Sequence, residues 1–297
     1  MDISVIGIGA MGAAVVERLL ATGHRVTIFN RSPERTVPLG EKGVRIAGSA
    51  REAVETTALT ISLVVDAPAM EAAILSDEIV PLLAGKAFMK MTTTNGRVAA
   101  AGGIRLDIAI LNFPDDVTAG KMHALVGAHQ SDFDEWAPML SDLGPKIVRV
   151  GDVGTASIAE NALLQIMMFQ VMTLAYGLAV FKRANLPQDV LMEATGENPL
   201  FQISMAEYFR GRMTNRDFTP PLYRLEKHMM DMQLTLDDME ELGIVTDGIR
   251  ALRQMFVTAT EQGLNENDYS AIYDVICARE SDKLRAALGN PNEPKRS

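Results

Sequence analysis

Residues Ile3 to Gly12 read I-S-V-I-G-I-G-A-M-G, the pattern that most clearly indicates how this chain folds. A short apolar run is followed by glycines spaced G-x-G-x-x-G and then by a helical pattern. In such a loop the first glycine permits a tight turn, the second lets a pyrophosphate approach the backbone, and the third lets helix and strand pack closely. The start of the helix adds N–H groups and a positive dipole end. The predicted cofactor contacts in this loop are Gly7, Gly9, Ala10, Met11 and Gly12.

The residues after the second predicted strand, Arg25–Phe29, indicate which dinucleotide binds. NAD-binding folds usually carry an acid there, about 20 residues past the glycines, which holds the ribose 2′-hydroxyl. This chain has Asn30-Arg31-Ser32 instead. The asparagine removes a charge that would repel a 2′-phosphate, Arg31 can pair with that phosphate bidentately, and Ser32 can add a hydroxyl. With Arg35 as a further candidate one turn on, the sequence predicts NADPH rather than NADH.

Two later strand ends are expected to flank the nicotinamide side of the cofactor, because ligands of doubly wound sheets lie outside the carboxyl ends of the strands. The predicted contacts at these ends are Val64, Val65, Asp66, Thr94 and Asn95. Asn95 can hydrogen-bond ribose, nicotinamide or substrate. The alternative is that it caps a helix that begins near Gly96.

The first half of the chain alternates short apolar runs with helical patterns, which predicts βαβ units and a mostly parallel, doubly wound sheet. Strands are predicted at Ile3–Ile8, Arg25–Phe29, Val44–Ile46, Leu59–Val65, Ala87–Met91, Arg105–Leu111, Ala124–Gly127 and Ile147–Val150. Helices are predicted at Met11–Ala21, Ala50–Thr56, Pro68–Leu75 and Val98–Ala101. The fold class is therefore α/β over residues 1–154, with a Rossmann domain that binds NADP.

The second half changes to all-α, with no convincing strand after Gly154. Helical patterns occur at about 155–184, 187–195, 199–211, 220–242, 246–262 and 268–286. Gly243 and Gly263 are expected to end two of these helices. The sequence thus predicts a helical domain for substrate binding and dimerisation over 155–297, joined to the first domain by a long interdomain helix.

Composition excludes several classes of function. A net charge of −10 argues against binding to nucleic acid or to an anionic membrane surface. One cysteine, and a first strand that begins almost at the first residue, predict a cytoplasmic protein without a signal peptide. The histidines show no metal-ligand spacing, so no metal is expected. Residues 161–181 are apolar enough for a membrane span, but a helix buried in a large protein has the same pattern and is preferred here.

Several motifs together resemble the 3-hydroxyisobutyrate dehydrogenase superfamily and, within it, the imine reductases and reductive aminases. The markers are GIGAMG at 7–12, NRS at 30–32, TTTNG at 92–96, DIAILNFP at 107–114, GDVGTASIAENALL at 151–164, LTLDDMEELG at 234–243 and GLNENDYSAI at 263–272. The resemblance covers nearly the whole chain. It implies a homodimer with interlocked C-terminal domains, in which Asp231 would reach the cofactor of the partner subunit.

The chain departs from the hydroxyacid dehydrogenases where their chemistry lies. The resemblance places their catalytic lysine at Glu160, their carboxylate-binding loop at 112–116 and a second lysine at Met230, next to Asp231. A lysine can stabilise charge on oxygen, whereas a carboxylate stabilises a cationic iminium or, with its pKa raised by burial, protonates nitrogen. Asp115 and Asp116 would repel a substrate carboxylate. These departures predict reduction of a C=N bond by NADPH.

Glu160 and Asp231 are the predicted catalytic residues, and the predicted substrate contacts are Asn112, Pro114, Phe169 and Met230. Position alone also allows Glu160 to serve only the helix dipole. His228 and Asp231 share a helix face and could form either a proton-handling pair or a surface pair. Two other functions stay open: an NADP-dependent dehydrogenase of a 3-hydroxyacid or small aldehyde, and a non-catalytic NADPH-binding protein.

Overall fold

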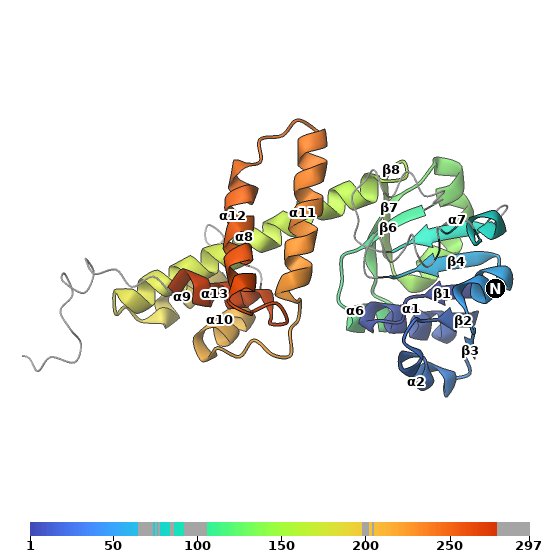
Figure 1. Ribbon diagram of the computed structural model, residues 1–297, viewed down its shortest axis with the longest axis horizontal. Helices are drawn as coiled ribbons and strands as arrows, with labels where there is room; N and C mark the ends of the chain where they lie inside the picture. Colours follow the sequence, from blue (N-terminus) through green and yellow to red (C-terminus); the bar gives the residue numbers. More distant parts are fainter. Residues whose placement is uncertain are drawn as a thin grey trace, which may run out of the picture. The chain divides into compact units, whose positions relative to one another are not determined.

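The protein is described by a computed structural model that covers residues 1–64, 74, 76, 78–83, 86–91, 106–197, 202–203 and 205–277. The chain divides into two compact units, Met1–Ala162 and Leu163–Ser297. A 29-residue helix, α8 (Thr155–Arg183), begins in the first unit and continues in the second (Figure 1).

The first unit is built on an eight-stranded sheet with the order β3-β2-β1-β4-β5-β6-β7-β8. The first six strands in this order follow the arrangement of dinucleotide-binding folds. All neighbouring pairs are parallel except β6 with β7. The strands are β1 (Asp2–Ile6), β2 (Arg25–Phe29), β3 (Arg45–Ile46), β4 (Leu59–Ser62), β5 (Ala87–Lys90), β6 (Leu106–Ile110), β7 (His123–Gly127) and β8 (Lys146–Gly151). The predicted doubly wound α/β sheet is confirmed.

Helices cover the sheet and bury its apolar side chains. They are α1 (Ala10–Ala21), α2 (Val37–Gly40), α3 (Ala50–Glu55), α6 (Pro114–Thr118) and α7 (Gln130–Leu143). The start of α3 is capped by Ser49, whose side chain accepts a hydrogen bond from the N–H of Glu52 at 3.1 Å. The predicted helices at 68–75 and 98–101 lie largely or wholly outside the described residues.

Helix α7, which is 14 residues long, is not among the elements predicted from the sequence. Its buried side chains, Trp136, Met139, Leu140 and Leu143, recur at the spacing of one helical face. Pro138 lies inside the helix, where proline is unfavourable, and most other residues of the segment are polar. The segment therefore contains no continuous apolar run that would indicate a helix.

The second unit is helical throughout its described part, as predicted, with only an isolated bridge between Arg224 and Asp268. After α8 come α9 (Gln188–Glu197), α10 (Ala206–Asn215), α11 (Leu225–Glu241), α12 (Asp247–Glu261) and α13 (Ile272–Cys277). Gly243 and Gly263 adopt φ values of +70° and +79° just after α11 and α12, where they were expected to end helices. Residues 278–286 of the last predicted helix lie outside the described residues.

The predicted start of α11 was five residues too early, because Pro220 and Pro221 precede the helix and cannot continue its hydrogen-bond ladder.

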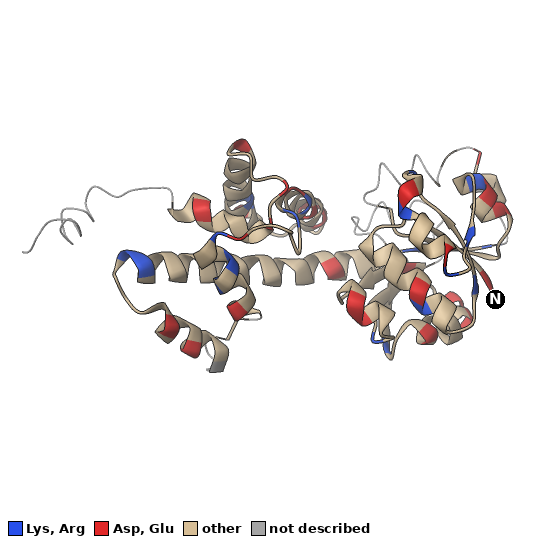
Figure 2. Ribbon diagram, turned by 90° about the horizontal axis from the view of Figure 1, so that it is seen from below, with Lys and Arg blue, Asp and Glu red and all other residues tan. Residues whose placement is uncertain are grey.

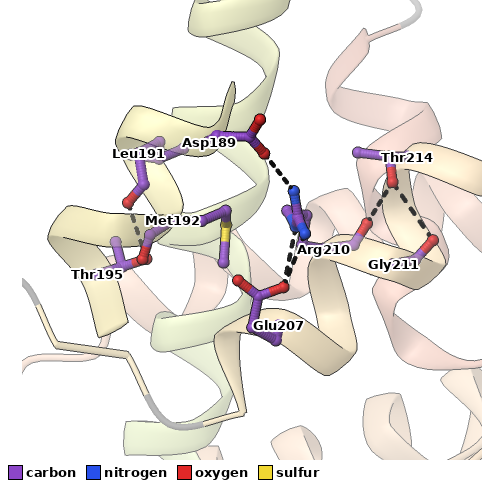
Figure 3. Close-up of polar contacts among 8 residues, drawn as sticks. All are labelled: Asp189, Leu191, Met192, Thr195, Glu207, Arg210, Gly211 and Thr214. Carbon is purple, nitrogen blue, oxygen red and sulfur yellow. Dashed lines mark hydrogen bonds and ion pairs between the residues drawn. The ribbon is translucent and has the colours of Figure 1, made fainter. Parts of the chain in front are cut away.

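An arginine connects α9 with α10. Arg210 donates to Asp189 at 2.8 Å and to Glu207 at 3.1 Å (Figure 3). Both acids are largely exposed, so this cluster contributes little to stability and mainly fixes the local geometry.

The apolar helix α8 is the one helix among the described residues whose length and hydropathy would suit a membrane span. Only 28% of its most apolar 18-residue window is buried within the chain. Glu160 is its only charged residue before Lys182, and Figure 2 shows how few charges lie along the helix. Several large apolar side chains of this helix are exposed, among them Ile166 at 56% and Val180 at 60%.

Candidate active site

The glycine loop after β1 forms a cradle that other residues would fill. A Cβ on Gly12 would lie 2.1 Å from the carbonyl oxygen of Gly7, and a Cβ on Gly7 would lie 2.6 Å from the carbonyl carbon of Leu63. A Cβ on Gly9, in contrast, would meet nothing within 4 Å. Gly9 is also the N-cap of α1, and its position provides no side-chain cap for the first N–H groups of the helix. Open space before uncapped N–H groups fits the pyrophosphate of a dinucleotide.

The asparagine at the end of β2 connects this cradle with the second strand. The Asn30 carboxamide oxygen accepts from the N–H of Ile8 at 2.8 Å, and its Nδ2 donates to the carbonyl of Ser32 at 3.0 Å. Arg31 and Arg35 are exposed beyond it. Asn30 thus holds the two loops together in addition to removing a negative charge, a role that the sequence did not indicate.

The carboxyl edge of the sheet carries a buried ion pair that was not predicted from the sequence. Lys90 ends β5 and Asp107 lies opposite it in the register of β6, with 2.5 Å between Lys90 Nζ and Asp107 Oδ1. Lys90 is 1% exposed and Asp107 is 0% exposed. One signal for the pair was present in the sequence: Lys90 and Asp107 are charged residues inside two successive apolar runs, and their signs are opposite.

This ion pair is bound to the first turn of α8 through Ser157. The Asp107 carboxylate accepts from both the N–H and the hydroxyl of Ser157, each at 2.9 Å, and Lys90 Nζ donates to the same hydroxyl at 2.6 Å. Ser157 is the third residue of the helix, so its N–H has no partner within the helix and is satisfied by Asp107. We call these three fully buried residues the Lys90–Asp107–Ser157 cluster.

Glu160 lies three residues after Ser157 on the same helix, half-buried and engaged in an interaction with other residues. Residues three apart on a helix are neighbours on its surface. Glu160 therefore lies beside the Lys90–Asp107–Ser157 cluster, in the same unit as the glycine cradle.

The loop after β6, predicted to contact substrate, has two structural roles. The Asn112 side chain accepts a hydrogen bond from the backbone N–H of His123, which joins the loop to β7. Pro114 is the first residue of α6, and Asp115 and Asp116 lie in its first turn, where acids interact favourably with the helix dipole. The presence of Asp115 and Asp116 can therefore be explained by their stabilisation of the start of α6 as well as by repulsion of a substrate carboxylate.

In the second unit the expected pairing of His228 with Asp231 is wrong in both forms. Both residues are fully buried, so they are no surface pair, and neither ring nitrogen of His228 has a hydrogen-bond partner among the described residues. The Asp231 carboxylate is instead bound by Lys227 Nζ at 2.5 Å and by the hydroxyl of Tyr223. Lys227, one turn before Asp231, therefore supplies the ammonium for this aspartate.

The remaining predicted contacts are placed as follows. Phe169 is half-buried against the core of the second unit, and Met230 is exposed on α11. Val64 is half-buried against a small apolar cluster of the first unit. Val65, Asp66, Thr94 and Asn95 lie outside the described residues. Within the described ranges, no group of three or more His, Cys, Asp or Glu side chains could hold a metal ion.

A dinucleotide-binding unit with an intact glycine cradle, followed by an all-helical unit, defines an oxidoreductase that uses a nicotinamide cofactor. Residues 2–151 match the family described as the NAD binding domain of 6-phosphogluconate dehydrogenase. Residues 151–276 match the family described as NAD-binding of NADP-dependent 3-hydroxyisobutyrate dehydrogenase. The chain belongs to the 3-hydroxyisobutyrate dehydrogenase superfamily, as its motifs predicted.

Individual relatives cover almost all of the chain at low identity. Glyoxylate/succinic semialdehyde reductase 1 of Arabidopsis thaliana is 23% identical over 93% of this chain and 98% of its own length. The crystal structure of 3-hydroxyisobutyrate dehydrogenase from Salmonella typhimurium matches with a TM-score of 0.81 at 21% identity, over 93% of this chain and 99% of that one. The imine reductase of Myxococcus stipitatus in complex with NADP+ matches with a TM-score of 0.64 at 25% identity, over 93% and 100%.

Proposed function

We propose that this oxidoreductase reduces C=N bonds with NADPH, as an imine reductase or reductive aminase, and that Glu160 is its catalytic acid. One observation carries the proposal: Glu160 is the only charged side chain between Thr155 and Phe181. Over these residues α8 keeps one half-buried carboxylate, at the position where the resemblance places the lysine of the hydroxyacid dehydrogenases. A carboxylate there suits a reaction in which positive charge is present on the substrate.

The chemistry assigns the charges as follows. When bound, NADPH supplies a hydride to the imine carbon. The Glu160 carboxylate stabilises the cationic iminium that accepts the hydride, or in its protonated form gives the proton to nitrogen. The same anion beside a developing alkoxide would raise the barrier, which disfavours the reduction of a simple carbonyl.

Three features support NADPH as the cofactor. Asn30 places a neutral carboxamide where NAD-binding folds carry an acid, and Arg31 and Arg35 are exposed beside it. A structural neighbour, the Myxococcus stipitatus imine reductase, is known with NADP+ bound.

Steady-state oxidation of NADPH by the full-length protein tests the proposal. Cyclic imines of the 1-pyrroline type are expected to be turned over, and Glu160→Gln is expected to lower kcat by about 100-fold. Glu193→Gln, which changes an exposed acid on α9, is the matched control and keeps full activity. A lack of activity on every imine, combined with native oxidation of a 3-hydroxyacid, would sink the proposal.

A second candidate, reduction of a small aldehyde that carries a carboxylate, is favoured by Lys227. Its side chain is 24% exposed, and Asp231 fixes its ammonium from the buried side. Such a group can bind a substrate carboxylate. The Arabidopsis relative is named for glyoxylate and succinic semialdehyde, which both carry one. If Lys227 binds the substrate carboxylate, Lys227→Met is expected to raise the KM for these two aldehydes and to leave the KM for a neutral imine unchanged.

We further propose that a second copy of the chain covers α8, which makes the protein a homodimer. Large apolar side chains, 42–60% exposed, recur at helical spacing along one stripe of the helix, namely Leu163, Ile166, Tyr176 and Val180. Ile166→Lys combined with Val180→Lys is expected to give a monomer by size-exclusion chromatography with light scattering. Ser141→Lys on α7 is the control and keeps the wild-type mass. A monomeric wild-type protein contradicts the proposal.

A further inference from the structure

The Lys90–Asp107–Ser157 cluster requires an explanation beyond stability. A buried ion pair loses the hydration of both charges and is often no more stable than an apolar pair of similar volume. Here the pair lies at the carboxyl edge of the sheet, where ligands of such folds bind, and three hydrogen bonds with Ser157 connect it to the start of α8. The arrangement therefore fixes one helix turn relative to that edge.

We propose that Lys90, Asp107 and Ser157 are positioning residues that hold Glu160 in its reactive place, with two opposite charges balanced beside its carboxylate, an inference that rests on the function proposed above. Asp107 binds Ser157 at two atoms, which fixes both the height and the rotation of the first turn of α8. Glu160 follows one turn later on the same face. A rotation of this turn would move its carboxylate away from the reacting nitrogen.

A close approach of helix and sheet supports this role. A Cβ on Gly127 of β7 would lie 2.7 Å from the carbonyl of Asp152 and 3.0 Å from Oγ1 of Thr155. The segment at the start of α8 therefore contacts the backbone of β7 directly. Packed on one side and hydrogen-bonded by Asp107 on the other, this turn has little freedom to shift.

The charges of the cluster give the proposal a second consequence. Lys90 from β5 favours the ionised form of Glu160, while Asp107 from β6 opposes it, because an opposite charge stabilises a carboxylate and a like charge destabilises it. Among the described residues, the other titratable groups near the helix start are Arg149 on β8, Asp152, which pairs with Arg149 at 3.0 Å, and His129, 3.5 Å from Asp152. These three stay the same in every variant compared below.

The geometric part is tested with Ser157→Ala, which removes one hydroxyl and leaves both charges in place. We expect kcat for a cyclic imine to fall by about tenfold or more, because small misplacement of a catalytic group is costly. The Kd for NADPH, measured by fluorescence, is expected to stay within about twofold. Hydrogen exchange of the amides at 155–162 is expected to rise, whereas exchange of the glycine loop at 7–12 is unchanged.

The electrostatic part is tested by the pH dependence of kcat. One limb of the plot of kcat against pH is expected to follow the ionisation of Glu160. Lys90→Met is expected to move the midpoint of this limb to a higher pH by about one unit, and Asp107→Asn to a lower pH by a similar amount. The double variant, which has lost both charges, is expected to return close to the wild-type profile. A cluster with a merely structural role lowers activity without opposite shifts.

The results separate this inference from the proposed function. If Glu160→Gln abolishes turnover while Ser157→Ala and the double variant keep kcat within about twofold, the positioning role is refuted and the function stands. If Glu160→Gln keeps full activity, the function itself fails. Shifts of the pH limb in the same direction for both single variants also overturn the inference.

Discussion

Replacing His228 with phenylalanine is expected to make the second unit less sensitive to acid. This histidine is fully buried on α11 among the rings of Tyr223, Phe256 and Tyr269, with ring centroids 4.5–5.6 Å apart. Burial, with a smaller contribution from the nearby Lys227 ammonium, lowers the pKa of His228 from 6.5 to about 3. The unfolded chain therefore takes up a proton near pH 6.5 that the folded chain resists.

The magnitude follows from this difference in pKa. The contribution of neutral His228 to the free energy of unfolding is fully present above pH 6.5. It is lost at about 1.4 kcal/mol per pH unit as the pH falls toward the pKa of His228 in the folded chain. At pH 4.5, two pH units below the ordinary pKa of histidine, the loss attributable to His228 is about 3 kcal/mol. Phenylalanine keeps the aromatic packing and has no proton to take up, so this part of the acid sensitivity disappears.

Urea unfolding followed by far-UV circular dichroism at pH 7.0 and pH 4.5 measures the effect. His228→Phe is also expected to be at least as stable as the wild type at pH 7, because it removes two buried nitrogens that have no hydrogen-bond partner among the described residues. His129→Phe is the control, since that side chain is 71% exposed. If His228→Phe and the wild type lose the same stability between the two pH values, the reasoning is refuted.

Four further variants test the cofactor loop and the fold. Gly9→Ala is expected to leave the free energy of unfolding within about 1 kcal/mol while weakening NADPH binding, whereas Gly12→Ala, whose methyl meets a carbonyl at 2.1 Å, destabilises the protein by about 1–3 kcal/mol. Equal stability of both would contradict the cradle. Arg31→Ala is expected to raise the KM for NADPH about tenfold with little change for NADH, and equal changes would rule out a 2′-phosphate contact. Ser49→Ala is expected to lower stability by about 1 kcal/mol in urea unfolding, and no change would show that the cap is not used.

The sheet and the glycine loop could be predicted because their signals are local. The strand Arg25–Phe29 has the predicted bounds, and α1 begins one residue earlier than predicted. Short apolar runs between turn residues are visible within a few positions of the chain, and the spacing of Gly7, Gly9 and Gly12 serves one function at one place. Ends of elements were less accurate, as in β4, which ends at Ser62 rather than at Val65.

The Lys90–Asp107–Ser157 cluster could not be predicted from local sequence patterns. Its members are separated by 17 and 50 residues in the chain and meet only because β5 and β6 are neighbours in one register. A one-residue slip of that register would move Asp107 to the other face of the sheet. The sequence could therefore show that a lysine and an aspartate lie in apolar strands, but not that they form a pair.

The hydrogen-bond partners of Asp231 could not be predicted from the sequence of its own helix alone. His228 and Lys227 precede it by three and four residues, so both are neighbours on the helix surface and the sequence offers no choice between them. Tyr223, which lies before α11, decides the pairing, because its hydroxyl binds the carboxylate while its ring packs edge-on against His228. The carboxylate then pairs with the ammonium that reaches solvent, and the imidazole is left in an apolar cage. The partly exposed member of the Lys227–Asp231 pair is therefore the positively charged lysine. This observation supports a substrate that carries a carboxylate as the alternative to an imine.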